Sequence, residues 1–403
     1  MNSTTVETAT ENSNRKSVRL HYLDWLRVLA IFGVFLFHAV HPFDMFPWEI
    51  KNAEQSIAAT LFIVFLAPWG MPLFFLVSGV GSWFALRKRT GKQYAIERVN
   101  RLLIPFIVGA LLLSPFQFYF QWRHQTETGI FVGSPIEFLR AREISFGPRI
   151  FGWAGYHLWF LGFLFAFSLI ALPLFLWLKG DSGQKFIDWL ARLSEKRAGL
   201  LVFIIPLVLV QYILRPFFPA EHDWADFVFL LIFFILGYIL YADGRFIRPI
   251  QRDWLIMLLL AILSTLFFFG AGFFDVATEW MEASDSPGFY LLWSMWSVNS
   301  WCWTMFMMNI GMRYLDFRNK WLDYCLEIIV PFFLIHQPVI ILISYFVVQW
   351  EAGISAKLVT VVIGSFLISI VLVELLIRPF KPMRRLFGMK ARGRNEDAKK
   401  TFT

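Results

Sequence analysis

The sequence predicts an all-α polytopic integral membrane protein with about ten transmembrane helices and both termini in the cytoplasm. Hydrophobic residues make up 58% of its 403 residues and charged residues only 16%, against about 45–50% and about 25% in soluble domains. Apolar segments recur from residue 23 to residue 380, and positive charges concentrate in alternate loops. This composition excludes a soluble domain and a disordered chain, and two cysteines are too few for a disulfide scaffold.

Helices are predicted for ten segments, because about 20 apolar residues are needed to cross a hydrocarbon core roughly 30 Å thick. No segment alternates polar and apolar residues as a membrane β-strand does. The second and fourth segments are long enough to tilt, kink or re-enter the membrane. The ten segments are residues 23–42, 57–86, 102–121, 154–178, 199–218, 225–242, 254–274, 288–312, 322–347 and 357–380.

The distribution of Lys and Arg predicts which side is cytoplasmic. Of the 37 Lys and Arg residues, 29 fall in the two tails and in the loops on the N-terminal side of the membrane, and seven fall in the opposite loops. Cytoplasmic loops carry the excess of positive charge in membrane proteins. Both termini are therefore expected in the cytoplasm, and the protein in a plasma membrane of the bacterial inner-membrane type.

One domain is predicted between two short tails. Residues 1–20 are polar and rich in Ser and Thr, which predicts a disordered cytoplasmic tail. Residues 21–380 form the transmembrane domain, whose first helix is expected to be retained because no cleavage site follows it. Residues 381–403 are a basic cytoplasmic tail, read as a topology signal that contacts anionic lipids. Membrane lipids are thus expected partners, and nucleic acid is not.

The first helix carries four ionisable side chains, Asp24, Arg27, His38 and His41. Such residues are costly in lipid and mark functional sites by default. Eleven residues separate Arg27 from His38, which puts both on one helix face about 16 Å apart along the axis. Asp24 and His41 lie on nearly the same stripe. The sequence leaves open that Arg27 only reaches the inner headgroups and that His38 only hydrogen-bonds a neighbouring helix.

The second span contains Pro68, Pro72 and the run Ser78-Gly79-Val-Gly81. Proline interrupts the hydrogen bonding of a helix and frees a carbonyl. Inside a membrane such an interruption is tolerated where it lines a cavity. We therefore expect this helix to be broken beside a cavity, with a kink that merely packs as the alternative.

Two arginines precede the third span. Arg98 and Arg101 are three residues apart, which in a regular helix directs both side chains the same way. They could form a fork for phosphates or carboxylates. The alternative is that both are ordinary charges of a cytoplasmic loop.

Two further histidines lie in or near predicted helices. His157 is near the outer start of the fourth span, and His336 is inside the ninth, with Glu327 on the opposite helix face. An interfacial aromatic belt for His157 and a simple interhelical hydrogen bond for His336 remain alternatives. No spacing of Cys and His indicates a metal site, and no nucleotide-binding or serine-hydrolase motif is present.

The order of these motifs resembles the acyltransferase 3 family of membrane O-acyltransferases over roughly residues 20–380. The opening residues, His21-Tyr-Leu-Asp-Trp-Leu-Arg-Val-Leu-Ala30, are most similar to the subgroup that contains periplasmic glucan succinyltransferases. One departure is Glu327-Ile-Ile-Val-Pro331, where family members often have a Ser/Tyr-rich stretch. The motifs are Asp24-Trp-Leu-Arg27 followed by ten residues and His38, Pro72-Leu-Phe-Phe-Leu-Val-Ser78-Gly79, Arg98-x-x-Arg101-x-x-x-Pro105, His157-Leu-Trp-Phe-Leu161 and Phe-Leu-Ile-His336-Gln-Pro338.

The resemblance implies an enzyme that moves an acetyl or succinyl group from cytoplasmic acyl-CoA to a hydroxyl of a glycan or other envelope acceptor. It implies that Arg27 positions acyl-CoA and that His38 acts on the acceptor hydroxyl. No tightly bound cofactor and no metal are expected, since acyl-CoA is a co-substrate. Residues expected to contribute to substrate binding are Asp24, His41, Ser78, Arg98, Arg101, His157 and His336.

A proton-coupled secondary transporter is the main competing prediction, since buried Arg, Asp and His also suit proton coupling. Many transporters have broken helices at matching positions of two repeats. Segment 254–274 would match the second span in a five-helix repeat, yet it has no proline. A non-catalytic partner in an envelope assembly is the third reading, and it requires no alignment of Arg27 with His38. We therefore expect the acyltransferase.

Overall fold

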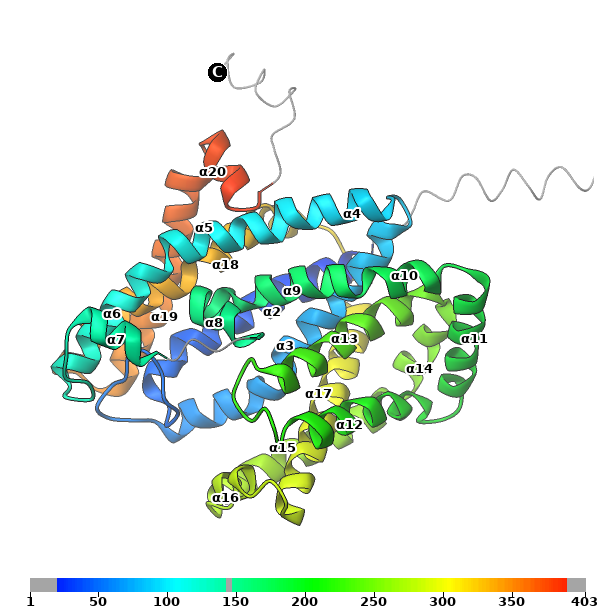
Figure 1. Cartoon of the computed structure of the whole chain (residues 1–403), viewed down its shortest axis with the longest axis horizontal. Helices are drawn as coiled ribbons and strands as arrows, with labels where there is room; N and C mark the ends of the chain where they lie inside the picture. Colours follow the sequence, from blue (N-terminus) through cyan, green and yellow to red (C-terminus); the bar gives the residue numbers. More distant parts are fainter. Residues whose placement is uncertain (1–19, 143–146, 390–403) are drawn as a thin grey trace, which may run out of the picture.

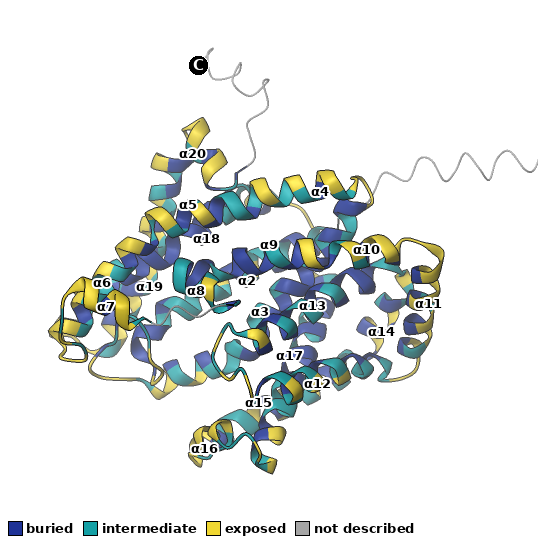
Figure 2. Ribbon diagram, viewed as in Figure 1, coloured by how far each residue is buried: buried dark blue, intermediate teal, exposed yellow. Residues whose placement is uncertain are grey.

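The computed structural model describes residues 20–142 and 147–389, and every regular element in these ranges is a helix. Helices α2 (His21–Val40), α3 (Ile57–Leu86), α13 (Trp224–Ala242), α17 (Pro287–Tyr314) and α18 (Lys320–Val347) form the centre of the bundle. Helix α3 packs against α2, α13 and α17, and α18 packs against α2 (Figure 1). The central helices carry most of the fully buried side chains (Figure 2).

The other helices, most of them short, surround this centre. Helix α4, the π-helical turn η2, α5 and α6 follow one another almost without a break, as do α8, η3, α9 and α10. The surrounding elements are α4 (Gly91–Arg98), η2 (Val99–Leu103), α5 (Ile104–Leu112), α6 (Ser114–Glu127), α7 (Pro135–Ala141), α8 (Arg149–Gly155), η3 (Tyr156–Leu158), α9 (Trp159–Ile170), α10 (Leu172–Leu178), α11 (Asp181–Glu195), η4 (Gly199–Phe203), α12 (Ile204–Leu214), η5 (Gly244–Phe246), α14 (Ile247–Arg252), α15 (Trp254–Phe273), α16 (Ala277–Glu282), α19 (Ile354–Leu372), η6 (Val373–Ile377) and α20 (Lys381–Leu386).

Each of the ten predicted spans falls on helical structure. In the described ranges eight helical runs are long and apolar enough to cross a membrane. The other two predicted spans fall on Gly199–Leu214, which is shorter, and on α17, which has 28 residues but is less apolar. The multi-pass helical class is thus confirmed, whereas the count of ten and the cytoplasmic termini stay predictions. The tails predicted for residues 1–20 and 381–403 lie outside the described residues except for residue 20 and residues 381–389.

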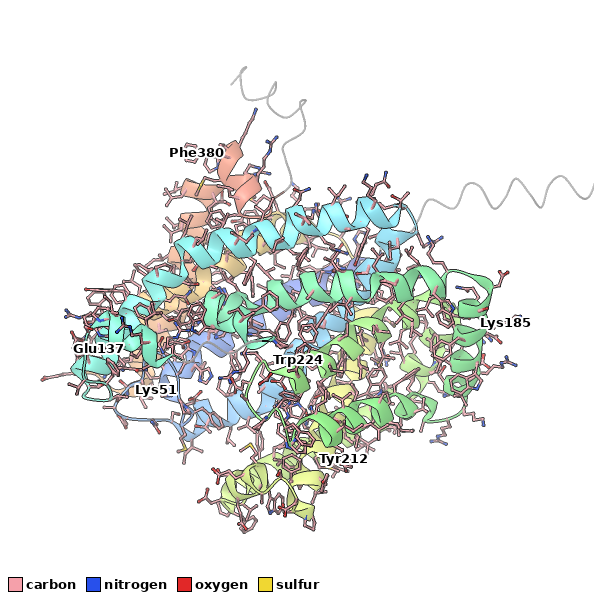
Figure 3. The ribbon with its side chains drawn as sticks, viewed as in Figure 1. Lys51, Glu137, Lys185, Tyr212, Trp224 and Phe380 are labelled. Carbon is pink, nitrogen blue, oxygen red and sulfur yellow. The ribbon has the colours of Figure 1, made fainter. Side chains whose placement is uncertain are left out.

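Residues from two of the predicted outer loops lie at one end of the view, far from a residue of a predicted inner loop. Lys51 and Glu137, from two predicted outer loops, lie near each other in Figure 3, and Lys185 of a predicted inner loop lies at the opposite end. Lys185 belongs to α11, a strongly amphipathic helix that buries Ile187 and Ala191 and exposes Trp189. Such a helix fits the membrane–water interface.

Polar residues fix where the long helices begin. The side chain of Ser56 accepts a hydrogen bond from a backbone N–H in the first turn of α3, and Ser286 and Asn319 do the same for α17 and α18. Helix α2 has no side-chain cap of its own. Instead the carboxylate of Asp316 accepts from the N–H of His21 at 2.9 Å. These contacts satisfy N–H groups that a helix leaves unpaired.

The predicted break in the second span is wrong, because α3 is one helix of 30 residues with Pro68 and Pro72 inside it. Pro72 has no N–H to offer the carbonyl four residues earlier, that of Pro68. The hydroxyl of Ser300, on α17, donates to this carbonyl at 2.5 Å. A hydrogen bond from a neighbouring helix thus replaces the missing one, and the helix continues.

Helices α3 and α13 cross at two glycines. A Cβ added to Gly79 would lie 1.9 Å from the carbonyl oxygen of Phe234, and one added to Gly237 would lie 2.0 Å from that of Leu76. Both obstacles are backbone atoms, which cannot move aside. Small residues at membrane helix crossings permit this close approach, so Gly79 of the Ser78-Gly79 motif has a packing role.

Candidate active site

One face of α2 lines a cavity of about 2210 Å³. At 1.5 Å per residue the cavity follows α2 for about 18 Å between Leu26 and His38. Of the two residues predicted to share this face, His38 lines the cavity and Arg27 does not, although the cavity reaches its neighbour Leu26. The lining residues recur every three or four positions; they are Leu26, Leu29, Ala30, Gly33, Val34, Phe37, His38 and His41.

The remaining walls of the cavity combine apolar surface with a few polar groups. The polar groups include Glu49, Gln121, Arg142 and His157, from four different parts of the chain. Such a mixture of aromatic walls and few convergent polar groups is typical of a ligand site. The tryptophans that line it are Trp48, Trp69, Trp159, Trp293 and Trp296.

Arg27 lies where α2 meets α3 and is not among the described residues that line the cavity. Its Nη1 donates to the Asp24 carboxylate at 3.1 Å, and its Nη2 lies 3.5 Å from the carbonyl of Val77. Gly81 leaves room for the guanidinium, because a Cβ there would lie 2.8 Å from Nη2. Asp24 and Arg27, which were predicted to lie on the same side of the helix, therefore form an ion pair. Gly81 of α3 leaves room for it.

Three histidines that are far apart in the sequence come together at His38. The ring centroids are 5.5 Å apart for His38 and His336, 6.2 Å for His38 and His157, and 4.9 Å for His157 and His336. His38 and His157 line the cavity, and His336 is fully buried. The belt position considered for His157 is excluded, since only 4% of this residue is exposed.

A change of chain direction at Tyr156 directs His157 inward. Helix α8 ends at Gly155, Tyr156 has a φ of 51°, and α9 begins at Trp159, so the fourth predicted span is interrupted. A positive φ in a residue with a side chain costs on the order of 1–3 kcal/mol and is found at functional sites. The hydroxyl of Tyr156 accepts from Arg142 at 2.8 Å and donates to Gln121 at 2.9 Å, which holds the turn.

His41 lies just past the end of α2, because Pro42 follows it in a short 3-10 turn. Its Nδ1 is 2.6 Å from an Asp44 carboxylate oxygen, and Lys51 Nζ is 2.9 Å from the other. Its ring stacks on Trp48 at 5.6 Å. An imidazole oriented by a buried carboxylate is also a possible base, so His41 is the direct rival of His38.

Arg98 and Arg101 do not lie on one regular helix. Arg98 ends α4, and Arg101 is inside the π-helical turn η2, so the assumed spacing of 100° per residue fails there. Arg98 lies over the ring of Tyr94 and donates to the Ser82 hydroxyl at 3.3 Å. Arg101 is 3.6 Å from Glu97. Ser78 donates no side-chain bond in the described structure and is not a described lining residue, but its carbonyl accepts from Ser82.

Glu327 faces away from the histidines, as its nine-residue separation from His336 predicts. It is 2.9 Å from Arg378 and 3.0 Å from Arg384. Arg378 also pairs with Glu374 at 2.9 Å. Glu327, where the sequence departs from the family pattern, is thus the centre of an ion-pair network. The network connects α18 with η6 and α20.

Loops bring further polar residues to the cavity that the sequence did not predict. Glu49 and Arg142 lie in predicted outer loops, where charged residues are common and carry no signal of their own. Burial raises the pKa of the Glu49 carboxyl above its ordinary value. Arg215 pairs with Asp226 and lies 4.1 Å from the centre of the Trp293 ring. Only Arg215 and Asp226 had a signal in the sequence, because both fall inside predicted spans, 199–218 and 225–242.

No cluster of His, Cys, Asp and Glu in residues 20–142 and 147–389 has the geometry to hold a metal ion. The polar groups at the cavity are imidazoles, carboxylates, guanidinium groups and amides. The imidazoles and carboxylates suit a reaction in which a proton is moved, and the guanidinium and amide groups can donate hydrogen bonds to charge that develops inside a partly apolar site.

Comparisons with known proteins agree with this chemistry. Proteins called "Glucans biosynthesis protein C" from Salmonella paratyphi A (strain ATCC 9150 / SARB42), Salmonella agona (strain SL483) and Salmonella enteritidis PT4 (strain P125109) are each 24% identical over 388 residues, covering 89% of this chain and 92% of theirs. No solved structure matches significantly. A family model described as "Acyltransferase domain", that of acyltransferase 3, matches residues 20–374. The chain therefore belongs to the acyltransferase 3 family and is an acyl-transferring membrane enzyme.

Proposed function

We propose that this enzyme transfers an acetyl or succinyl group from cytoplasmic acyl-CoA to a hydroxyl of a glucan or another envelope glycan, in a bacterial inner membrane. The observation that carries the proposal is the cavity along α2, which extends from Leu26, the neighbour of Arg27, to His38. That length of about 18 Å is comparable to a pantetheine arm. The name of the Salmonella relatives supports a glucan as acceptor.

The reaction needs a base, because a sugar hydroxyl is a poor nucleophile near neutral pH. In the proposed mechanism His38 takes the hydroxyl proton as the oxygen attacks the thioester carbonyl. The new C–O ester bond forms, the C–S bond breaks, and the CoA thiolate leaves and is protonated to the thiol. A positioned base contributes roughly 10²–10⁴ in rate, and imidazole is the side chain whose ordinary pKa suits this role.

Arg27 has the charge to hold the donor near the inner end of the cavity. Its ion pair with Asp24 at 3.1 Å fixes the guanidinium while about a third of the side chain stays exposed, at 32%. Asp24, Ser78, His41, His157 and His336 are proposed to shape the binding sites around this axis. The transporter considered from the sequence has no comparable support, since family membership identifies an acyl-transferring enzyme.

The test is a labelling reaction with the purified protein in lipid vesicles. Radiolabelled acetyl-CoA and succinyl-CoA are supplied separately, each with a glucan and with a mixed envelope-glycan extract. We expect ester-linked label on a glycan with one of the two donors, released by mild base. Labelled glycan from neither donor, with protein that is folded, contradicts the proposal.

Arg98 and Arg101 are predicted to bind the anionic CoA moiety from the cytoplasmic side. Replacing both with Gln should raise the KM for acyl-CoA about tenfold or more and change the KM for the glycan little, because charge-assisted hydrogen bonds to phosphate are lost. Steady-state kinetics with each substrate varied in turn measures this. Arg87→Gln with Lys92→Gln is the matched control for loop charge, and an unchanged donor KM in the Arg98/Arg101 variant identifies both as topology charges.

A further inference from the structure

Three buried ring nitrogens, one on each of the clustered histidines, have no hydrogen-bond partner among the described residues. They are Nδ1 of His38, Nδ1 of His157 and Nε2 of His336. A buried polar atom without a partner costs about 1–3 kcal/mol. Because the three atoms lie on three adjacent rings, we infer that these nitrogens hydrogen-bond to one another, directly or through a water molecule.

The protonation pattern of two of these rings follows from backbone carbonyls. His336 Nδ1 is 2.7 Å from the carbonyl oxygen of Phe333, and His157 Nε2 is 3.1 and 3.2 Å from those of Phe333 and Leu334. A carbonyl only accepts, so each of these ring nitrogens carries the hydrogen. In a neutral imidazole the other nitrogen then has the lone pair. His157 Nδ1 and His336 Nε2 are therefore both acceptors.

A proline makes this arrangement possible. In a regular helix the N–H of residue 338 would donate to the carbonyl of Leu334. Residue 338 is a proline inside α18 and has no N–H. The Leu334 carbonyl is consequently available to His157, which comes from a distant part of the chain.

If His38 is the base, its Nδ1–H needs a hydrogen-bond acceptor, and the rings of His157 and His336 each have one. If its Nε2 is to take a proton from the substrate, that nitrogen must have the lone pair, and Nδ1 must carry the hydrogen. Nδ1 of His38 is buried without a hydrogen-bond partner among the described residues. It lies next to the rings of His157 and His336, each of which has one acceptor nitrogen that is not yet used. Donor and acceptors are complementary.

We propose that His157 and His336 are positioning residues that accept the hydrogen bond of His38 Nδ1–H, directly or through one water molecule. They thereby hold His38 with its Nε2 lone pair toward the cavity and stabilise the imidazolium that forms in the reaction. This is the role of the carboxylate in a Ser-His-Asp triad, performed here by neutral rings that avoid a buried charge. The inference rests on the proposed function, in which His38 is the base.

Each ring has two roles: one nitrogen donates to a backbone carbonyl and the other is the proposed acceptor for His38. Replacement with asparagine or glutamine keeps one of these roles and removes the other. An Asn amide reaches roughly the position of Nδ1, and a Gln amide that of Nε2. His336→Gln keeps the acceptor and His336→Asn keeps the carbonyl bond, whereas for His157 the assignments are reversed. We expect His336→Gln and His157→Asn to retain more turnover than their counterparts, by about 10- to 100-fold, the usual effect of losing an orienting partner.

The KM for acyl-CoA should change little in all four variants, because the donor-binding charges are untouched. His21→Asn and His21→Gln, at the start of α2, control for the substitutions themselves. The proposal would be overturned if Asn and Gln had the same rank order of turnover at positions 157 and 336. It would also be overturned if all four variants lost turnover equally, or if none lost it. Activity that survives in a folded His38→Ala protein overturns the proposed base instead, so the two failures are distinguishable.

A spectroscopic measurement tests the proposal without requiring enzyme turnover, which matters if a variant is too unstable for the activity assay. Nitrogen-15 NMR of histidine-labelled protein in lipid, with His38 assigned by comparison with His38→Gln, reports which ring nitrogen carries the hydrogen. We expect hydrogen on Nδ1 of His38 in the unchanged protein and a mixture of tautomers in the double variant His157→Phe, His336→Phe. Hydrogen on Nε2 in the unchanged protein, or no change in the double variant, overturns the proposal.

Discussion

Replacing His38 with alanine is expected to reduce acyl transfer by at least about 10²-fold, the loss expected for a missing general base, while acyl-CoA still binds. His38 has the position for this role on three grounds. It lines the cavity, it follows Arg27 by eleven residues on the same helix, and its ring lies within 5.5 and 6.2 Å of those of His336 and His157. Single-turnover transfer and equilibrium binding of acyl-CoA, measured on the same preparation, separate the two properties.

Two companion variants complete this experiment. Arg27→Ala should weaken donor binding as well as transfer, because the guanidinium is the predicted anchor of the donor. His41→Ala removes the rival imidazole, which Asp44 orients at 2.6 Å. A folded His38→Ala protein with unchanged turnover, together with an inactive His41→Ala protein, transfers the base assignment to His41.

Replacing Gly79 with alanine is expected to prevent normal packing of the bundle. The added Cβ would lie 1.9 Å from the Phe234 carbonyl oxygen, and a carbonyl in the middle of α13 cannot turn away without breaking the helix. Overpacking a core costs typically 1–3 kcal/mol, and a backbone obstacle places this variant at or above that range. The yield of monodisperse protein in detergent and its thermal unfolding midpoint should both fall sharply. Gly237→Ala should behave in the same way.

Gly364→Ala is the matched control for these two substitutions. Gly364 also lies inside a membrane helix, α19, but a Cβ there would be 3.7 Å from a side-chain carbon, an ordinary contact. Alanine also favours a helix over glycine by about 1 kcal/mol, so the control should be neutral or stabilising. An unfolding midpoint that is unchanged in Gly79→Ala would show that α3 and α13 do not cross this closely.

The sequence predicted the features of this protein that are local. Apolar length located the helices, and the spacing of Arg27 and His38 predicted a shared face because both lie on one uninterrupted helix. The prediction of a break in α3 failed because Ser300, on a distant part of the chain, supplies the hydrogen bond that Pro72 removes, so the helix stays continuous. Prediction from spacing failed at Arg101, where the π-helical turn changes the angular spacing.

The gathering of the histidines could not be predicted from spacing. His157 and His336 are separated from His38 and from each other by more than a hundred positions, so no period of a helix relates them. Their meeting depends on the packing of α18 against α2, on the place of the short helix η3 that carries His157, and on the positive φ of Tyr156. Glu49 and Arg142 were missed for a similar reason, since only the folded loops bring them to the cavity wall.

The prolines of α3 and α18 have a consequence for biogenesis. Each leaves a carbonyl that its own helix cannot satisfy, in a lipid environment where no water is at hand. The donor for the Pro68 carbonyl is synthesised 232 residues later, and the Leu334 carbonyl is synthesised 177 residues after its donor, His157. Helix α3 therefore lacks one backbone hydrogen bond until α17 has been synthesised, which couples the assembly of an early helix to that of a late one.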